Sequence, residues 1–400
     1  MTKLGIMGGT FNPIHNGHIE IARIARQTAG LDEVLFLPDG EPPHKQIETL
    51  ASGASRYSMT VLAVYGCAGF EASELEIRRS GTTYTVDTLA QLKSQRPDDE
   101  IYYIVGADTL YQIEHWKAPE KLGAMCSLIA VPRPGDDRAL SAQAEHIRKR
   151  LNIRVYLAEE SGPDISSTEI RFRASQGGDL ATLVPAAVAD YIAQHGLYGA
   201  PYHWMTQRLQ ETLSPHRFRH TLSVAETAVI LAARFGVNPI QAHQAGLLHD
   251  CAKCLPLSQQ QSIAREHRLL LDKETLQSES ILHGYAGAAL AESEYGVKDV
   301  SVLAAIRCHT TGKVGMLPLD MAVYLADKIE PSRRSYPALE EVRTMAETDL
   351  LAATIRSLRS TLDYVAQRGG TTHPATRRAL EWLERMQREK EKKEAHQTKQ

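Results

Sequence analysis

The stretch GGTFNPIHNGH, from Gly8 to His18, decides the fold of the first half of the chain. It follows the short apolar run KLGIM and precedes HIEIARIARQTA, in which Ile19, Ala22 and Ala25 recur at helical spacing. This order predicts a buried strand, a loop and a helix. In an open α/β sheet, such a loop lies at the carboxyl end of its strand, where ligands bind, and the helix presents free N–H groups to anions.

Five further apolar runs follow in the first half: EVLFLP, FEASELEI, EIYYIVG, CSLIAVP and IRVYLA. Because they alternate with helical stretches, they predict an open, mostly parallel α/β sheet. After residue 200 such runs nearly vanish, and Leu222, Ala225, Val229 and Ala232 recur at helical spacing, which predicts an all-α second half. We therefore predict one domain at 1–199, a helical domain at 200–370, and a charged helix or tail at 371–400.

Charge and composition exclude several classes of protein. The 400 residues carry 45 basic and 48 acidic side chains, so the net charge of -3 offers no global attraction to nucleic acid or anionic membranes. No run approaches the roughly 20 apolar residues of a membrane span, and the N-terminus lacks a signal-peptide pattern. Five scattered cysteines do not form a disulfide framework, and we interpret Cys251 and Cys254 as helix-packing residues. We expect a cytoplasmic protein without nucleic-acid or membrane partners, and a homo-oligomer remains open.

Two stretches of the first half carry groups that bind phosphate. Gly8 and Gly9 would let the backbone approach a ligand, while His15 and His18, as partly or fully charged imidazoles, would stabilise a developing phosphorane. The second stretch is ISSTEIR, Ile165–Arg171, with hydroxyls at a predicted helix N-cap and an arginine one turn later. Each alone also fits a blander interpretation, namely a glycine turn with surface histidines or an ordinary capping box.

Together the two stretches resemble the signature motifs of the nucleotidylyltransferase superfamily, whose core is a Rossmann-like sheet. The intervening LPDGEPPHK, TTYTVDTL, IVGADTL, HWKAPEKL and VPRPG are similar to blocks of one branch, the bacterial nicotinate mononucleotide adenylyltransferases. This resemblance implies transfer of AMP from ATP to nicotinate mononucleotide, giving deamido-NAD and pyrophosphate, with Mg²⁺ on the phosphates. The competing hypothesis is an adenylyl- or cytidylyltransferase with another acceptor, such as a phosphopantetheine-like one.

The resemblance also implies roles for individual residues. His15, His18 and Arg171 would be catalytic. The residues implied for ATP binding are Gly8, Gly9, Thr10, Phe11, His18, Ile165, Ser166, Ser167, Thr168 and Arg171. Those implied for the nicotinate nucleotide are Asn12, Lys45, Thr85, Gly106, Asp108, Trp116 and Arg133. Within this set, Trp116 would stack on the pyridine ring and Thr85 would meet the carboxylate, whereas Asn12 departs from the Asp of many relatives.

The second half contains a different constellation of polar residues. It comprises four histidines and two aspartates on successive predicted helices: His220, His249, Asp250, His283, His309 and Asp327. Imidazole and carboxylate ligands suit a divalent Fe, Mn, Co or Zn ion, and Asp250 could bridge two ions. His249 and Asp250 lie inside the apolar run AGLLHDCA, where a buried polar pair needs compensating partners.

These residues resemble the H…HD…D signature of the HD-domain metal phosphohydrolases, with His220, His249, Asp250 and Asp327 in the signature positions. The strings HTTG and ADKIEP are similar to the branch that hydrolyses diadenosine tetraphosphate, a dinucleoside polyphosphate, to two ADP. The resemblance implies an HD-domain helical bundle in which Asp250 is catalytic. The polyphosphate contacts that it implies are Lys253, Arg307 and Arg333. Two alternatives stay open: a regulatory nucleotide-binding module, or a hydrolase of another ester such as an alarmone or a cyclic dinucleotide.

Overall fold

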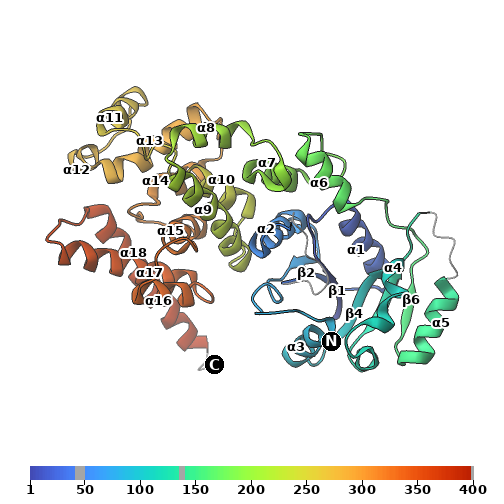
Figure 1. Cartoon of the computed structure of the whole chain (residues 1–400). Helices are drawn as coiled ribbons and strands as arrows, with labels where there is room; N and C mark the ends of the chain where they lie inside the picture. Colours follow the sequence, from blue (N-terminus) through green and yellow to red (C-terminus); the bar gives the residue numbers. More distant parts are fainter. Residues whose placement is uncertain (41–49, 135–139, 398–400) are drawn as a thin grey trace. The chain divides into compact units, whose positions relative to one another are not determined.

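A computed structural model describes residues 1–40, 50–134 and 140–397. The chain divides into two compact units, Met1–His203 and Trp204–Gln400 (Figure 1). This division lies four residues beyond the boundary that composition predicts at 199/200.

The N-terminal unit contains a six-stranded sheet in which every strand pair is parallel. Its strands are β1 (Lys3–Gly9), β2 (Glu33–Pro38), β3 (Phe70–Ala72), β4 (Glu100–Gly106), β5 (Ser127–Val131) and β6 (Val155–Leu157). The spatial order β3-β2-β1-β4-β5-β6 is that of the doubly wound dinucleotide-binding folds, in which the order reverses between β1 and β4. The predicted Rossmann-like α/β class is therefore confirmed, and each of the six apolar runs contains one strand.

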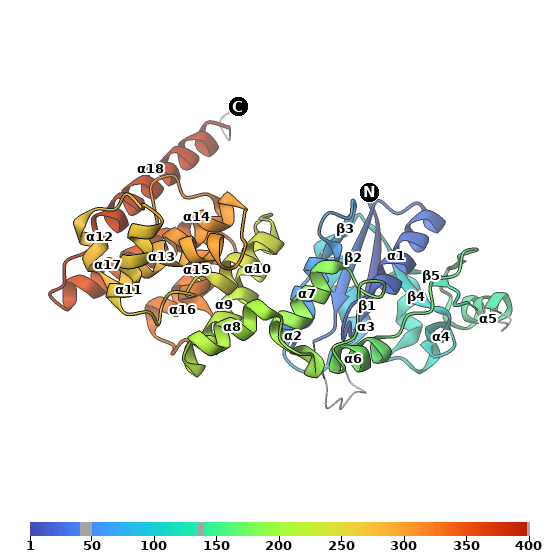
Figure 2. The same ribbon diagram turned by 90° about the horizontal axis from the view of Figure 1, so that it is seen from above.

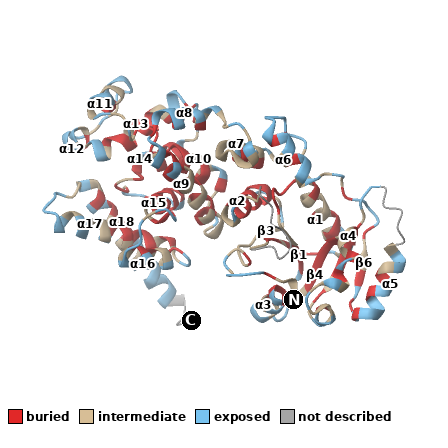
Figure 3. Ribbon diagram, viewed as in Figure 1, coloured by how far each residue is buried: buried red, intermediate tan, exposed pale blue. Residues whose placement is uncertain are grey.

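Helices cover both faces of this sheet. Those of the N-terminal unit are α1 (Asn16–Ala29), α2 (Gly53–Val64), α3 (Thr85–Gln95), α4 (Ala107–Leu110), α5 (Leu140–Leu151), α6 (Ser167–Ser175) and α7 (Ala186–His195), with short 3₁₀ turns η1 (Ile113–His115), η2 (Pro119–Ala124) and η3 (Leu197–Gly199). Alternate residues of a strand point to opposite faces. Thus Ile6 packs in the cluster with α3 and α5, whereas Met7 packs in the cluster with α1, α2, α6 and α7. Figure 3 shows the resulting concentration of buried residues in the central strands.

The C-terminal unit is entirely helical in its described residues. Its helices are α8 (Trp204–Thr212), α9 (Pro215–Arg234), α10 (Pro239–Leu248), α11 (Leu257–Glu266), α12 (Lys273–Gln277), α13 (Glu279–Ser293), α14 (Val300–Cys308), α15 (Pro318–Ile329), α16 (Pro337–Met345), α17 (Leu350–Gln367) and α18 (Pro374–Gln397). Helix α15, PLDMAVYLADKI, is buried on almost every side and packs against α9, α10, α14, α16 and α17. It therefore forms the centre of this bundle, and its aspartates are buried with it.

The charged C-terminal segment begins as part of the bundle. Helix α18 packs on α17, and Ala379 and Leu383 are fully buried. Figure 2 shows the later turns of α18 extending away from the other helices, and residues 387–395 are mostly exposed there. The solvated character that composition suggests therefore applies to the last turns only. In the described part of the chain, no helix has the length and apolarity needed to cross a bilayer.

The glycine pair of the opening stretch belongs to β1, so the predicted loop begins two residues too early. Gly8 pairs with Leu37 and Gly9 with Pro38 of β2. A Cβ on Gly8 would stand 2.3 Å from the hydroxyl oxygen of Tyr103. The side chain of Tyr103 on β4 therefore leaves no room for a Cβ at Gly8. The sequence suggested only that a ligand needs this room.

We predict that Gly8→Ala lowers the stability of the chain by about 1–3 kcal/mol, the usual range for overpacking a tight site. Tyr103→Phe removes the clashing oxygen. Adding Gly8→Ala to Tyr103→Phe should therefore cost much less stability than adding Gly8→Ala to the wild type. Thermal unfolding of the four proteins measures this coupling. Strictly additive losses would contradict the proposed clash.

Candidate active sites in the two units

The two phosphate-binding stretches of the N-terminal unit meet in space. The Ser167 hydroxyl donates a hydrogen bond to the carbonyl of Pro13 at 3.0 Å, and Arg171 Nη1 donates to the carbonyl of Asn12 at 2.8 Å. Ser166 is the N-cap of α6, where its hydroxyl accepts a hydrogen bond from the Thr168 amide. The N-terminus of α6 therefore lies against the loop that leads into α1.

His15 and His18 are stacked, with ring centroids 3.6 Å apart. The His15 amide donates to Nδ1 of His18 at 3.2 Å, so the proton of a neutral His18 lies on Nε2. Burial, and then the charge of Arg133, lowers the pKa of His15 to about 4. Burial, His15 and Arg133 lower the pKa of His18 well below its usual value. In the free site both rings are therefore neutral near pH 7, which differs from the partly or fully charged imidazoles expected to meet phosphate.

A cavity of about 420 Å³ opens beside this histidine pair, between the carboxyl ends of β1 and β4. This is the point where the strand order reverses, which is the usual ligand site of such sheets. The lining includes these residues that the sequence singled out: Gly8, His15, His18, Gly106, Asp108, Trp116, Arg133, Ile165, Ser166 and Ser167. Asp108 and Arg133 form an ion pair of 3.4 Å, and Trp116 packs edge-on against Tyr103.

Other candidate residues do not line the cavity but support its walls. Phe11 packs edge-on against His18, and Asn12 Oδ1 accepts hydrogen bonds from the Ala51 amide and the Tyr198 hydroxyl. The side chain of Asn12 thus holds two other segments in place, and an Asp at this position could accept the same two hydrogen bonds. Gly9, Thr10, Thr168 and Arg171 likewise lie outside the lining, and Thr85 begins α3. Lys45 lies outside the described residues.

A role for the buried Arg56 of α2 was not predicted from the sequence. Its side chain is 1% exposed and pairs with Asp39 at 2.8 Å, and it donates to the carbonyls of Thr10, Gly40 and Ala51. The Thr10 hydroxyl donates to the same Asp39 carboxylate. Arg56 therefore joins the loop after β1 to the end of β2. The one feature of the sequence that points to Arg56 is its charge, because the other residues of α2 are uncharged and mostly small or apolar.

In the C-terminal unit, the tight packing of α9 on α10 brings the first two candidate ligands together. A Cβ on Gly246 would stand 2.8 Å from the Cα of Ala225, so only glycine permits this approach. His220 lies on α9, and His249 follows α10 directly. Their rings lie 5.4 Å apart, edge to face.

All six predicted metal-ligand candidates are buried in one cluster. His220 Nε2 lies 3.0 Å and His249 Nε2 lies 3.8 Å from the same oxygen of Asp327. Asp250 Oδ1 lies 3.1 Å from His283 Nε2 and 3.5 Å from His309 Nε2. The ligand atoms form two groups that could each hold an ion and that share a histidine: His220, His249 and Asp327, and His249, Asp250 and His309.

The protonation of the histidines from the second group and its neighbour, His249, His309 and His283, fits divalent metal ions as well. Nδ1 of His249 and Nδ1 of His309 each lie 2.7 Å from a backbone carbonyl, which can only accept, so both Nδ1 atoms carry the proton. Their Nε2 atoms then present lone pairs to the cluster, and that of His249 is buried without a hydrogen-bond partner. Burial lowers the pKa of His249 and His283 to about 4, which keeps both imidazoles neutral as metal ligands require.

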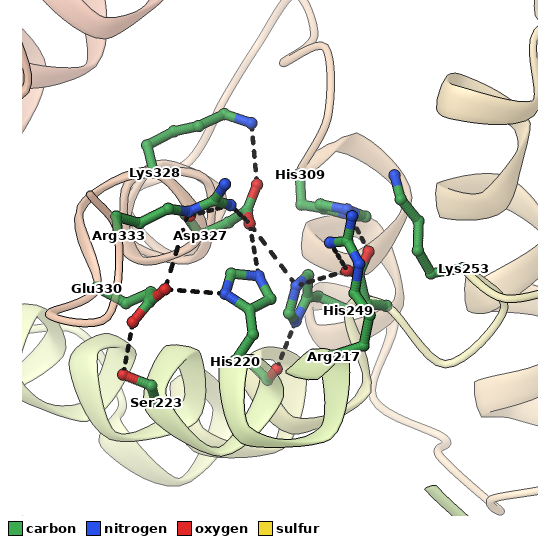
Figure 4. Close-up of polar contacts among 12 residues, drawn as sticks. Arg217, His220, Ser223, His249, Lys253, His309, Asp327, Lys328, Glu330 and Arg333 are labelled. Carbon is green, nitrogen blue, oxygen red and sulfur yellow. Dashed lines mark hydrogen bonds and ion pairs between the residues drawn. The ribbon is translucent and has the colours of Figure 1, made fainter. Parts of the chain in front are cut away.

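Glu330, which lies in the string ADKIEP and has no role predicted from the sequence, orients His220. Its carboxylate lies 3.0 Å from Nδ1 of His220 and accepts hydrogen bonds from Ser223 and Ser332. Burial alone would raise the pKa of Glu330, but these hydrogen bonds outweigh it and lower the pKa to about 2. A charged acceptor on Nδ1 fixes the imidazole with Nε2 toward Asp327 (Figure 4).

Cations surround the two aspartates. Arg333 Nη2 and Lys328 Nζ lie 2.6 and 2.9 Å from Asp327, and Arg217 Nη1 lies 3.1 Å from Asp250. Of the predicted polyphosphate contacts, Arg333 and Lys253 lie at the cluster, the latter 3.4 Å from His283. Arg307 is exposed on α14. The positions of Arg217 and Lys328 beside the two aspartates were not predicted from the sequence.

The interpretation of the C-x-x-C pair as helix-packing residues is wrong for one member. Cys251 is buried and its thiol contacts the carbonyl of Gly287, but Cys254 is exposed. Helix α10 ends at Leu248, and the chain turns through both cysteines before α11 begins.

Comparisons with known proteins agree with both folds. The cytidylyltransferase-like family matches residues 6–173, and the HD-domain family matches residues 217–332. A probable nicotinate-nucleotide adenylyltransferase of Synechococcus sp. is 40% identical over 200 residues, which are 50% of this chain and 96% of the relative. Another, of Clavibacter michiganensis subsp. michiganensis, is 42% identical over 199 residues, 50% of this chain and 95% of the relative.

Among solved structures, one described as a predicted HD superfamily hydrolase involved in NAD metabolism, from Clostridium acetobutylicum, is 37% identical. The match has a TM-score of 0.44 and covers 45% of this chain and 94% of that chain.

The fold and the site at the end of β1 define a nucleotidyltransferase of the cytidylyltransferase-like class, joined to an HD domain. Since it covers nearly the full length of relatives about 40% identical to it, the chain belongs to the nicotinate-nucleotide adenylyltransferase family. These relatives account for half of the chain. The resemblance of the first half to nicotinate-nucleotide adenylyltransferases is thus confirmed, and so is the presence of an HD domain in the second half. The hydrolase activity of the HD domain and its substrate stay predictions.

We predict that Glu330→Ala weakens the binding of Mn²⁺ by about 10- to 100-fold, the usual cost of removing a carboxylate behind a metal-bound histidine. Glu330→Gln keeps an acceptor for His220 Nδ1 and should lose less. Calorimetric titration of the full chain measures the affinity, with the exposed Glu340→Ala as control. Equal affinity in Glu330→Ala and the wild type would show that His220 needs no orienting partner.

Proposed function

We propose that the N-terminal unit transfers AMP from ATP to nicotinate mononucleotide, giving deamido-NAD and pyrophosphate in NAD biosynthesis. The observation that carries this proposal is the meeting of the two distant stretches beside one cavity at the switch point of the sheet. The names of the relatives, probable nicotinate-nucleotide adenylyltransferases, support the choice of acceptor. Trp116, Asp108 and Arg133 line the same cavity, where they would meet the nicotinate nucleotide.

In this reaction a phosphate oxygen of the mononucleotide forms a bond to the α-phosphorus of ATP, and the bond from that phosphorus to the pyrophosphate oxygen breaks. The protein needs no nucleophile, so its contribution is positioning and charge stabilisation. His18 would donate from Nε2 to the α-phosphate, because its Nδ1 is occupied by the His15 amide. The amides at the start of α1 and α6 would meet the remaining phosphate oxygens. Mg²⁺ would enter with the triphosphate and neutralise its charge.

His18→Ala should lower the rate of deamido-NAD formation by at least about 100-fold, the usual effect of losing one transition-state donor. Chromatography of ATP with nicotinate mononucleotide measures the product. The exposed His146→Ala serves as the matched control and should retain full activity. Near-normal turnover in His18→Ala would remove this histidine from the mechanism.

We further propose that the HD domain hydrolyses dinucleoside polyphosphates, with diadenosine tetraphosphate cleaved symmetrically to two ADP. The buried cluster of four histidines and two aspartates carries this proposal, since its two groups could hold a pair of ions. Divalent metals bound there would supply Lewis-acid activation of water and of the scissile phosphate. A water oxygen adds to an inner phosphorus, and the bridging oxygen leaves with the other ADP.

The chain's own residues would act around that cluster. His220, His249, Asp250, His283, His309 and Asp327 would hold the ions. Lys253, Arg217 and Arg333 would meet phosphate oxygens, since each lies at the edge of the cluster and is partly exposed. A regulatory nucleotide-binding module remains the alternative function of this domain, and it would bind nucleotide without releasing product.

Asp250→Ala should lower the rate of ADP release from diadenosine tetraphosphate by at least about 100-fold, as expected for the loss of a major electrostatic group. Deamido-NAD formation should be unchanged in this variant, and Glu292→Ala should leave both activities intact. Anion-exchange chromatography of the products distinguishes the cases. Release of AMP and ATP would mean asymmetric cleavage and would overturn the substrate assignment.

A further inference from the structure

The loop between β1 and α1 has a strained backbone at Phe11. Its φ of 47° lies in the left-handed region, which an aromatic residue adopts only at a cost. In this conformation the buried ring of Phe11 meets the His18 ring edge-on, with the ring centroids 4.9 Å apart. Such strain persists only where surrounding contacts outweigh it. The contacts that hold Phe11 in place therefore also fix one side of His18.

Hydrogen bonds hold the backbone on both sides of Phe11. On the preceding side, the buried Arg56 donates from Nη1 to the carbonyl of Thr10 at 2.8 Å. On the following side, Arg171 donates from Nη1 to the carbonyl of Asn12 at 2.8 Å. Two arginines from different helices, α2 and α6, thus grip the peptides next to the strained residue.

The buried side chain of Asn12 is held by two further donors. Its Oδ1 atom accepts hydrogen bonds from the Ala51 amide at 3.1 Å and from the Tyr198 hydroxyl at 2.9 Å. An amide oxygen has two lone pairs, so these two donors use both. Burial raises the pKa of the Tyr198 hydroxyl, which therefore keeps its proton near pH 7 and can donate it to this bond.

The backbone of Tyr198 is strained as well. Its φ of 60° and ψ of 21° place it in the left-handed region within η3, which packs against α6 and α7. Glycine adopts such a backbone at no cost, as Gly196 and Gly199 do nearby. A tyrosine at this position is therefore explained by what its side chain contacts. That contact is Asn12, which lies 186 positions away in the sequence.

We propose that Tyr198 is a positioning residue of the adenylyl-transfer site and acts on His18 through the loop after β1. Its hydroxyl fixes Asn12 and thereby the strained conformation of Phe11, whose ring sets the position of His18. The inference rests on the proposed transfer of AMP to nicotinate mononucleotide. It adds to that site a residue of the final 3₁₀ turn of the N-terminal unit, which does not line the cavity.

Tyr198→Phe removes the hydroxyl and keeps the ring, so it tests the hydrogen bond and little else. The full chain is assayed with ATP, Mg²⁺ and nicotinate mononucleotide, and chromatography follows deamido-NAD. The kcat should fall by about 10- to 100-fold, the scale at which a small misplacement of a catalytic group acts. The KM values should stay near those of the wild type, because His18 would act in the transition state. Tyr65→Phe, which removes an exposed hydroxyl of the same unit, should leave kcat unchanged.

The same substitution is then made in His18→Ala. If Tyr198 acts through His18, the double variant and His18→Ala should have the same kcat, because the group that Tyr198 positions is already gone. A role in general stability would instead lower kcat by the same factor in both backgrounds.

The possible outcomes separate the two proposals. Equal losses in both backgrounds, a loss confined to KM, or an unchanged kcat in Tyr198→Phe would overturn the positioning role and leave the proposed reaction in place. If the wild type forms no deamido-NAD, both proposals fall.

Discussion

The buried carboxylate of Asp327 is the constraint on which the C-terminal unit depends. A charge inside a helical core is costly unless its oxygens have partners, and Asp327 finds them in His220, Lys328 and Arg333. Burial alone would raise the pKa of Asp327, but the charge of Lys328 and the hydrogen bond to His220 outweigh it and lower the pKa well below its usual range. Because these partners come from α9, from α15 and from the loop after α15, the helices must converge on this carboxylate, and the same convergence gathers the remaining candidate ligands.

The two units use histidine in opposite ways, and the backbone decides which. In the N-terminal unit, an amide donates to Nδ1 of His18, so its Nε2 carries the proton and can donate to an anion. In the C-terminal unit, Nδ1 of His249 and of His309 donates to a carbonyl, so their Nε2 atoms carry lone pairs and can bind a cation. Burial keeps the pKa of both His15 and His249 near 4. A neutral imidazole thus occurs in both sites, and a single backbone hydrogen bond decides whether its Nε2 atom can donate or accept.

The sequence predicts the fold class and the members of each cluster well, because these follow from local patterns. Six apolar runs become six strands, and the four histidines and two aspartates predicted as metal ligands in the second half all reach one place. The supporting residues could not be predicted, since their role depends on how separate elements cross. Arg56 is buried only because Asp39 and several loop carbonyls surround it, and Glu330 acts only because α9 passes beside the end of α15. The requirement for Gly8 likewise arises from Tyr103, almost a hundred residues further along the chain.

Lys328 and Arg333 show how a structural and a functional requirement can share the same residues. Their contacts to Asp327 would suffice to explain them as compensation for a buried charge. In the proposed hydrolase, metal ions bound at the cluster would engage the Asp327 oxygens, and the two cations would then face the phosphates of the substrate instead. Each cation would thus have two successive partners, first the carboxylate and then a phosphate, so that the same side chains could serve both the folded core and the proposed reaction.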